Sequence, residues 1–169
     1  ARRLRHRLLA SGCGGILLLV APSIVTPSPR LVWNASASMP IGLYRITRDA
    51  MPGRGDIVLV RLPPAVGQLA AARGYLPAGV PLLKPVAAIA GDPVCTRGAV
   101  VAIGARPVAS RRLVDARGRL LPWWDGCRRL RAGELLLLAR DAPASFDGRY
   151  FGPVATRLVI GRATPLWTR

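Results

Sequence analysis

Proline and glycine punctuate this chain at short intervals, and they limit what it can fold into. The 169 residues include 16 prolines and 18 glycines, spread along the whole sequence. Because both residues interrupt regular elements, this spacing argues against a helical bundle. An apolar fraction of 51% is enough for a core. We therefore predict one mainly β domain of short strands joined by turns, preceded by an N-terminal segment.

The strands are predicted from short runs of aliphatic and β-branched residues between turn residues. One run contains Pro85, which donates no ladder hydrogen bond and therefore indicates an edge strand or the start of a strand. A short helix is predicted over 65–73 and a hairpin over 113–124. The predicted strands are 57–60, 82–90, 99–103, 134–139 and 155–161.

The N-terminal segment combines a basic start with an apolar run. Residues 1–7 carry four arginines, and residues 8–25 are mostly apolar, close to the roughly 18–20 residues that span a bilayer. The positive-inside rule then predicts a cytoplasmic tail over 1–7, a transmembrane anchor over 8–25, a linker over 26–33 and a periplasmic domain over 34–169. A cleaved secretory signal is the alternative. Cys13 resembles a lipoprotein site only faintly, and we expect a buried membrane thiol.

The formal net charge of +17 comes from 24 arginines and one lysine against eight acidic residues. Such a chain attracts nucleic acids and anionic lipids in general. The arginines are scattered, however, and neither an aromatic stacking platform nor a recognition helix accompanies them. We therefore expect a solvated basic surface and no specific nucleic-acid partner.

The single lysine, Lys84, lies among Leu82, Leu83 and Val86 in an apolar run. Arginine stays charged, whereas a buried lysine loses its proton more readily and can then act as a base. A chain that uses lysine only once therefore points to a need for a deprotonatable amine there. Chance is one alternative, and an ammonium group that snorkels to the surface is another.

Ser36 and Ser38 stand two residues apart, just before Pro40 and Gly42. In an extended segment residues i and i+2 point to the same side, so both hydroxyls can face one site. The proline and glycine indicate a shaped loop after them. The alternative is an ordinary Ser/Ala-rich linker.

A second polar group follows near the C-terminal end, where Ser145, Asp147 and Arg149 stand within five residues. These side chains either orient a nearby catalytic amine or form only a turn held by an ion pair. The only histidine, His6, precedes the apolar run, on the wrong side of a membrane for the main domain. A Ser-His-Asp triad and a histidine metal site are thereby excluded, and we expect no metal and no cofactor.

Cys95 and Cys127 are the two cysteines of the exported domain. An even pair in an exported domain predicts a disulfide. It would close a loop of about 33 residues and contribute roughly 3–4 kcal/mol on the chain-entropy model. Two free thiols are the alternative, and zinc is disfavoured because two thiols without histidine do not fill a tetrahedral site.

The content and order of four stretches, residues 36–40, 55–58, 83–92 and 145–150, are conspicuous. Together these stretches resemble the type I signal peptidases, membrane-anchored proteases with a Ser/Lys dyad. Details of these stretches resemble the conjugal-transfer branch of TraF-type peptidases, notably residues 38–44, 146–153 and 164–167. The resemblance implies a mainly antiparallel β catalytic domain with one N-terminal transmembrane helix.

Carried over by position, Ser38 resembles the family's nucleophile and Lys84 its general base. Ser36 matches the hydroxyl that completes the oxyanion hole with the Ser38 backbone N–H. Ser145 and Asp147 match the family's residues that hold the lysine and order the site, and Arg149 accompanies them structurally. The resemblance implies cleavage of exported precursors after small residues, with water or an incoming amine resolving the acyl-enzyme.

Two departures from the general leader peptidases favour the conjugal branch, whose substrate would be a pilin or another transfer precursor. Pro85 follows the lysine where those enzymes usually have arginine, and residues 141–144 replace an Asn/Asp-rich lead. The alternatives are a general signal peptidase that acts on secretory preproteins, a non-catalytic membrane-anchored component of a secretion apparatus, and a DNA-binding transfer protein, whose binding would depend steeply on salt. A self-cleaving repressor is rejected because no helix-turn-helix domain precedes the four stretches.

Overall fold

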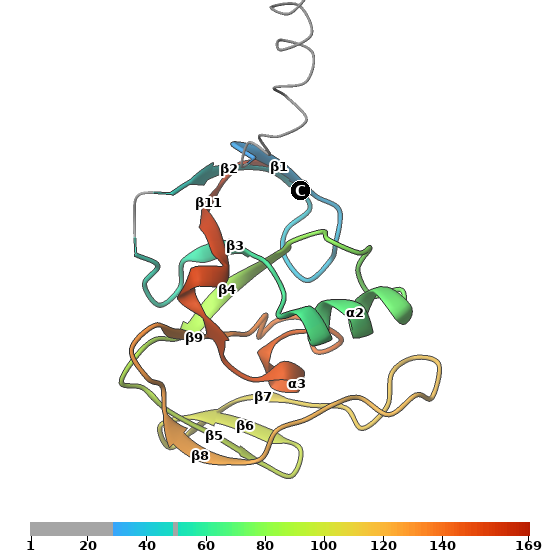
Figure 1. Ribbon diagram of the computed structural model, residues 1–169, viewed down its shortest axis with the longest axis vertical. Coiled ribbons are helices and arrows are strands. Elements are labelled where there is room, and N and C mark those ends of the chain that lie inside the picture. The colour runs from blue at the N-terminus through green and yellow to red at the C-terminus, as the bar shows by residue number, and fades with distance from the viewer. Residues whose placement is uncertain (1–28, 49–50) are drawn as a thin grey trace, which may run out of the picture.

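The computed structural model describes residues 29–48 and 51–169 (Figure 1). Within these ranges, no helix is both long enough and apolar enough to cross a membrane. Outside them lie the predicted tail over 1–7, the predicted anchor over 8–25, His6, Cys13 and the first residues of the predicted linker.

Antiparallel pairing joins the described strands into two sheets, which confirms the mainly antiparallel β prediction. The larger sheet contains seven described strands in the order β1-β2-β11-β3-β4-β9-β10. In that order the strands are Leu31–Asn34, Gly42–Thr47, Val159–Thr168, Ile57–Val60, Leu82–Ala88, Glu134–Leu137 and Val154–Ala155.

The smaller sheet contains four described strands in the order β7-β6-β5-β8. In Figure 1 it lies at the end of the molecule opposite β1 and β2. These strands are Arg106–Ser110, Val100–Ile103, Pro93–Arg97 and Gly126–Arg129.

Two α-helices and one 3-10 helix complete the described elements: α2 over Pro64–Ala72, α3 over Gly148–Phe151 and η1 over Thr156–Leu158. Helix α2 agrees with the predicted helix and begins after Pro63, with Pro64 in its first turn. Proline is favoured there because the first helical N–H groups have no partner within the helix.

The core has a cluster on each face of the large sheet and a third cluster between the sheets. Val58 and Val60 of β3 pack on one face and Leu59 on the other. Burial on both faces explains why this strand is apolar throughout instead of alternating. Ala88 of β4 packs with Val94 of the small sheet, so β4 belongs to both layers of the core.

Strand β4 corrects one prediction, because it is an interior strand that pairs with β3 on one side and β9 on the other. Pro85 is tolerated there because its nitrogen faces the point where the pairing with β9 ends. The N–H of Val86 donates to Asp56 on the β3 side, and Leu138, just beyond β9, donates to the Pro85 carbonyl. Opposed residues of an antiparallel pair exchange two hydrogen bonds, so the proline forgoes only the return bond to the Leu138 carbonyl, just beyond the end of β9.

Three further expectations differ from the structure. Part of the predicted linker is strand β1, which pairs with β2. The predicted hairpin over 113–124 is reduced to one isolated bridge between Val114 and Leu120. The predicted strand over 155–161 is divided between β10, η1 and the start of β11.

Candidate active site

Ser36 and Ser38 lie in a turn between β1 and β2, not in an extended segment. The N–H of Met39 faces the carbonyl of Ser36 at 3.5 Å. The two serine Oγ atoms are nevertheless only 3.1 Å apart. The prediction that both hydroxyls face one site therefore agrees with the structure, although the i and i+2 argument behind it is wrong. We call residues 35–41, which carry the predicted nucleophile Ser38, the nucleophile loop.

The far end of the nucleophile loop is held against β11. A Cβ atom built on Gly42 would lie 2.0 Å from the Trp167 carbonyl oxygen. The φ angle of Gly42, +154°, also lies in a region that favours glycine. The hydroxyl of Tyr44 donates to the Pro40 carbonyl at 2.8 Å. Gly42 and Tyr44 thus position the loop from inside the large sheet.

Lys84 projects from β4 into the same site and is only 2% exposed. Its Nζ lies 2.5 Å from Ser38 Oγ and 2.8 Å from Ser145 Oγ. Burial lowers the pKa of Lys84 to about 8, Asp147 opposes this shift and Arg149 adds to it. The side chain does not snorkel to the surface, and much of it is neutral at mildly alkaline pH.

Asp147 and Arg149 form a buried ion pair behind the site, with side chains 0% and 1% exposed. Arg149 Nε donates to Asp147 Oδ1 at 2.8 Å, and the N–H of Ala139 donates to Asp147 Oδ2 at 3.0 Å. The guanidinium also donates to the carbonyls of Ala139, Pro143 and Ser110. These hydrogen bonds go to β7 and to the loops around the pair and not to Lys84, on which Asp147 and Arg149 act through charge.

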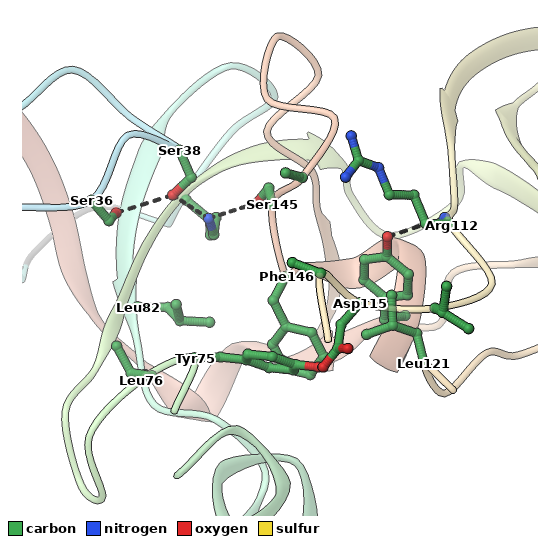
Figure 2. Close-up of a pocket in the computed structure, with 15 residues that line it drawn as sticks. Ser36, Ser38, Tyr75, Leu76, Leu82, Arg112, Asp115, Leu121, Ser145 and Phe146 are labelled. Atoms are coloured by element: carbon green, nitrogen blue, oxygen red, sulfur yellow. Dashed lines mark hydrogen bonds between the residues drawn. The ribbon is translucent and has the colours of Figure 1, made fainter. Parts of the chain in front are cut away.

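A cavity of about 350 Å³ opens beside these groups (Figure 2). Figure 2 shows Ser36, Ser38 and Ser145 on one side of it and the rings of Tyr75 and Phe146 on another. Such a volume is in the range of ligand pockets and exceeds what one methyl side chain needs. It has room for several residues of a bound peptide.

The segment 112–121 forms the remaining wall of the cavity and is tied to the end of α2. Tyr75 Oη donates to Asp115 Oδ2 at 2.5 Å, and Arg119 Nε donates to the same oxygen at 2.7 Å. These bonds, led by the Tyr75 hydroxyl, hold the pKa of Asp115 well below its usual range. Sequence reasoning missed Tyr75 and Asp115, because nothing local links residues 40 positions apart.

Sequence reasoning also gave no role to Asn34, the last residue of β1, whose side chain is buried beside the nucleophile loop. Its place at the start of the Ser/Pro/Gly stretch was the available signal, because asparagine often bonds to nearby backbone in turns.

Cys95 and Cys127 are joined by a disulfide between β5 and β8, where the two residues are directly paired. The bond lies in the small sheet, and neither cysteine lines the cavity. Within residues 29–48 and 51–169, no three His, Cys, Asp or Glu side chains gather as metal ligands would.

Comparisons with known proteins point to one family. A family model described as "Signal peptidase, peptidase S26" matches residues 5–167. The plasmid transfer protein TraF of Escherichia coli is 32% identical over 166 residues, covering 92% of each chain. The conjugal transfer protein TraF of Agrobacterium tumefaciens (strain 15955) is 33% identical over 179 residues, covering 98% of each chain. The crystal structure of a signal peptidase I from Enterococcus faecalis is more distant, with a TM-score of 0.40 and 20% identity over 68% of this chain and 98% of that one. On the family match and these TraF relatives, the chain belongs to the signal peptidase family S26, in its TraF-type branch.

Proposed function

We propose that this chain is a membrane-anchored serine endopeptidase that cleaves exported precursor proteins after small residues, and that its substrate is a pilin or another precursor of conjugative transfer. The supporting observation is the contact of Ser38 Oγ with the buried amine of Lys84 at 2.5 Å. A serine hydroxyl is a weak nucleophile until an adjacent base takes its proton. A buried lysine can supply that base once it is neutral.

In the proposed reaction Ser38 Oγ attacks the scissile carbonyl while its proton moves to Lys84 Nζ. The resulting oxyanion is stabilised by the Ser36 hydroxyl and the Ser38 backbone N–H, and a donor of this kind is often worth about 3 kcal/mol. Lys84 then gives its proton to the leaving amine, and water resolves the acyl-enzyme by the reverse route. Ser145, at 2.8 Å from Lys84 Nζ, holds the amine in line.

We propose that the chain lies at the inner membrane, with the N-terminus in the cytoplasm and the catalytic domain in the periplasm, and an exposed apolar face supports contact with a membrane. Trp33 of β1 and Trp167 of β11 both pair with Leu43, and their rings stack with centroids 5.7 Å apart. Both tryptophans are about half exposed, at 53% and 54%. Leu31, two residues before Trp33 on β1, is also exposed, and Leu43 is half-buried. Tryptophan is the residue most typical of the membrane–water interface.

The test is cleavage of a pilin precursor and a generic preprotein by the detergent-solubilised full chain. We expect the wild type to cut the pilin precursor faster and Lys84→Arg, which keeps the charge but removes the base, to cut neither. Ser38→Ala is the matched variant, because it changes one oxygen atom in a partly exposed loop and leaves the core intact. A Ser38→Ala protein that cuts as well as wild type would exclude the proposed nucleophile.

A further inference from the structure

Asn34 makes hydrogen bonds to both ends of the nucleophile loop. Its Nδ2 group lies 2.9 Å from the Ser36 carbonyl oxygen and 3.0 Å from the carbonyl oxygens of Met39 and Pro40. Its Oδ1 atom accepts from the Ser36 N–H at 3.2 Å and from Ser36 Oγ at 3.0 Å. The residue is 7% exposed, so water does not substitute for these partners.

These contacts define which way the Asn34 amide points. Carbonyl oxygens only accept hydrogen bonds, so the three carbonyls near one end of the amide require its NH₂ group there. Exchanging the amide oxygen and nitrogen would put an oxygen against all three carbonyls. Oδ1 therefore faces Ser36 and acts as a fixed acceptor.

A line of polar atoms then runs from the lysine to this acceptor. Lys84 Nζ contacts Ser38 Oγ at 2.5 Å, Ser38 Oγ contacts Ser36 Oγ at 3.1 Å, and Ser36 Oγ contacts Asn34 Oδ1 at 3.0 Å. Each serine hydroxyl has one proton to donate. The protonation state of the lysine therefore decides the direction of the Lys84–Ser38 and Ser38–Ser36 bonds, whereas the bond between Ser36 and Asn34 always runs toward the amide oxygen.

With Lys84 charged, its ammonium group only donates, so Ser38 accepts from it and passes its own proton toward Ser36. Ser36 then donates to Asn34 Oδ1, which ends the line. With Lys84 neutral, the amine accepts the Ser38 proton, and the Ser36 proton is free to turn to a substrate oxyanion. Bonds aligned in this way strengthen one another.

We propose that Asn34 is a positioning residue that sets the direction of the hydroxyl line. The Ser36 hydroxyl donates to Asn34 Oδ1 while Lys84 is charged and to the oxyanion when Lys84 is neutral. This inference rests on the proposed function, because it assigns the Ser36 hydroxyl to the oxyanion. Asn34 acts through Ser36 and does not touch the reacting atoms. Its loss should lower kcat with little change in KM.

The charged form of Lys84 depends on the acceptor at the end of the line. Asn34→Ala removes that acceptor and should lower the pKa of Lys84, whereas Asn34→Asp puts a negative charge there and should raise it. The charged groups that act on Lys84 from the segment behind it, Asp147 and Arg149, are unchanged in both variants. The two substitutions therefore move the same measurement in opposite directions.

The measurement exploits the composition of the chain, since Lys84 is the only lysine. Selective ¹³C-lysine labelling of the full chain in detergent gives one side-chain signal, whose titration needs no assignment. We expect the pKa to fall by about 0.5 in Asn34→Ala, the size of one ordinary hydrogen bond. The control is Tyr44→Phe, which removes another bond to the loop, from Tyr44 Oη to the Pro40 carbonyl, without touching the hydroxyl line. It should leave the titration unchanged.

A double-mutant cycle separates a role through Ser36 from a general role in folding. Ser36→Ala cuts the line one step earlier, so it should lower the pKa of Lys84 as Asn34→Ala does. Adding Asn34→Ala to Ser36→Ala should change neither the pKa nor kcat further. If Asn34→Ala folds poorly, Ser36→Ala alone still tests the line, because it removes the hydroxyl that joins Ser38 to Asn34.

An unchanged Lys84 titration in Asn34→Ala and Asn34→Asp would overturn the proposal, and so would additive effects in the cycle. An equal loss of kcat in Asn34→Ala and Tyr44→Phe would contradict the proposal, because it would show that Asn34 only holds the loop in place. A wild-type chain that cuts no precursor would contradict the proposed function instead. The titration would still report whether Asn34 controls the hydroxyl line.

Discussion

Lys84 Nζ lies 2.5 Å from Ser38 Oγ, although 46 residues separate the two in the chain. The contact is made inside the protein, because Lys84 is only 2% exposed. A buried amine prefers its neutral form, and a neutral amine beside a hydroxyl is a base. The pH dependence of cleavage follows from this pair.

The cleavage rate should rise with pH and level off above about pH 8. Burial lowers the pKa of Lys84 to about 8, so the neutral, proton-accepting form is the minority species below that pH. At pH 7 only about a tenth of the enzyme has a neutral lysine. We expect kcat/KM to increase almost tenfold per pH unit at low pH. A profile that is flat or falls between pH 6 and 8, with the fold intact by circular dichroism, would contradict the assignment.

Breaking the buried Asp147–Arg149 pair should destabilise the fold. Arg149→Met leaves the Asp147 carboxylate buried without its partner, which typically costs about 3–5 kcal/mol. The double variant Asp147→Asn/Arg149→Met should recover part of this loss, because neither side chain of the pair is then charged. Urea denaturation gives the free energies of unfolding.

The control for this prediction is the exposed pair Arg128–Glu134, whose side chains are 40% and 24% exposed. Arg128→Met should cost under about 1 kcal/mol. Equal losses from Arg149→Met and Arg128→Met would show that burial does not decide the strength of these pairs.

Removing the disulfide should weaken the fold without disabling the site. Cys95 and Cys127 join two strands of the small sheet, with a sequence separation of 32 residues. The chain-entropy model gives roughly 3–4 kcal/mol for a loop of this size. Cys95→Ala/Cys127→Ala should lower the midpoint of thermal unfolding but retain cleavage at 25 °C. Lost cleavage in a still-folded variant would assign the small sheet a part in catalysis.

The tryptophans of the apolar face should report contact with lipid. The chain has four tryptophans, of which Trp33 and Trp167 form the stacked pair and Trp123 is similarly exposed on the 112–124 segment. In full-length protein reconstituted with brominated lipids, we expect the fluorescence of Trp33 and Trp167 to be quenched. Trp33→Phe/Trp167→Phe should remove most of the quenching, and Trp123→Phe should not. The reverse result would show that this face does not contact the membrane.

The chemistry of the site was more predictable from the sequence than its architecture. Ser36, Ser38, Lys84 and Ser145 stand in short local motifs, and the structure brings these four side chains into one hydrogen-bonded group. Their catalytic roles stay predictions. The burial of Lys84 was also predictable, because its neighbours in the chain are apolar on both sides.

Long-range pairing explains most of what the sequence could not predict. Strand β8, Gly126–Arg129, is exposed along its whole length, so no hydrophobic alternation marks it. Strand β2 is formed against β11, which comes much later in the chain. Pro85 predicted an edge strand because proline has no N–H. The proline fits in the interior strand β4 because its nitrogen faces the end of the pairing with β9, which the local sequence does not reveal.

The packing of β11 against Gly42 has a consequence for when the candidate site is assembled. The nucleophile loop is closed from behind by the Trp167 carbonyl, and the Arg169 N–H donates to the Ile41 carbonyl at 3.0 Å. A chain emerging from its N-terminal end therefore exposes Ser38 long before the strand that shapes its loop is available. The site therefore forms only after β11 has been made and has paired with β2. Under the proposed function, cleavage waits until this C-terminal strand is in place.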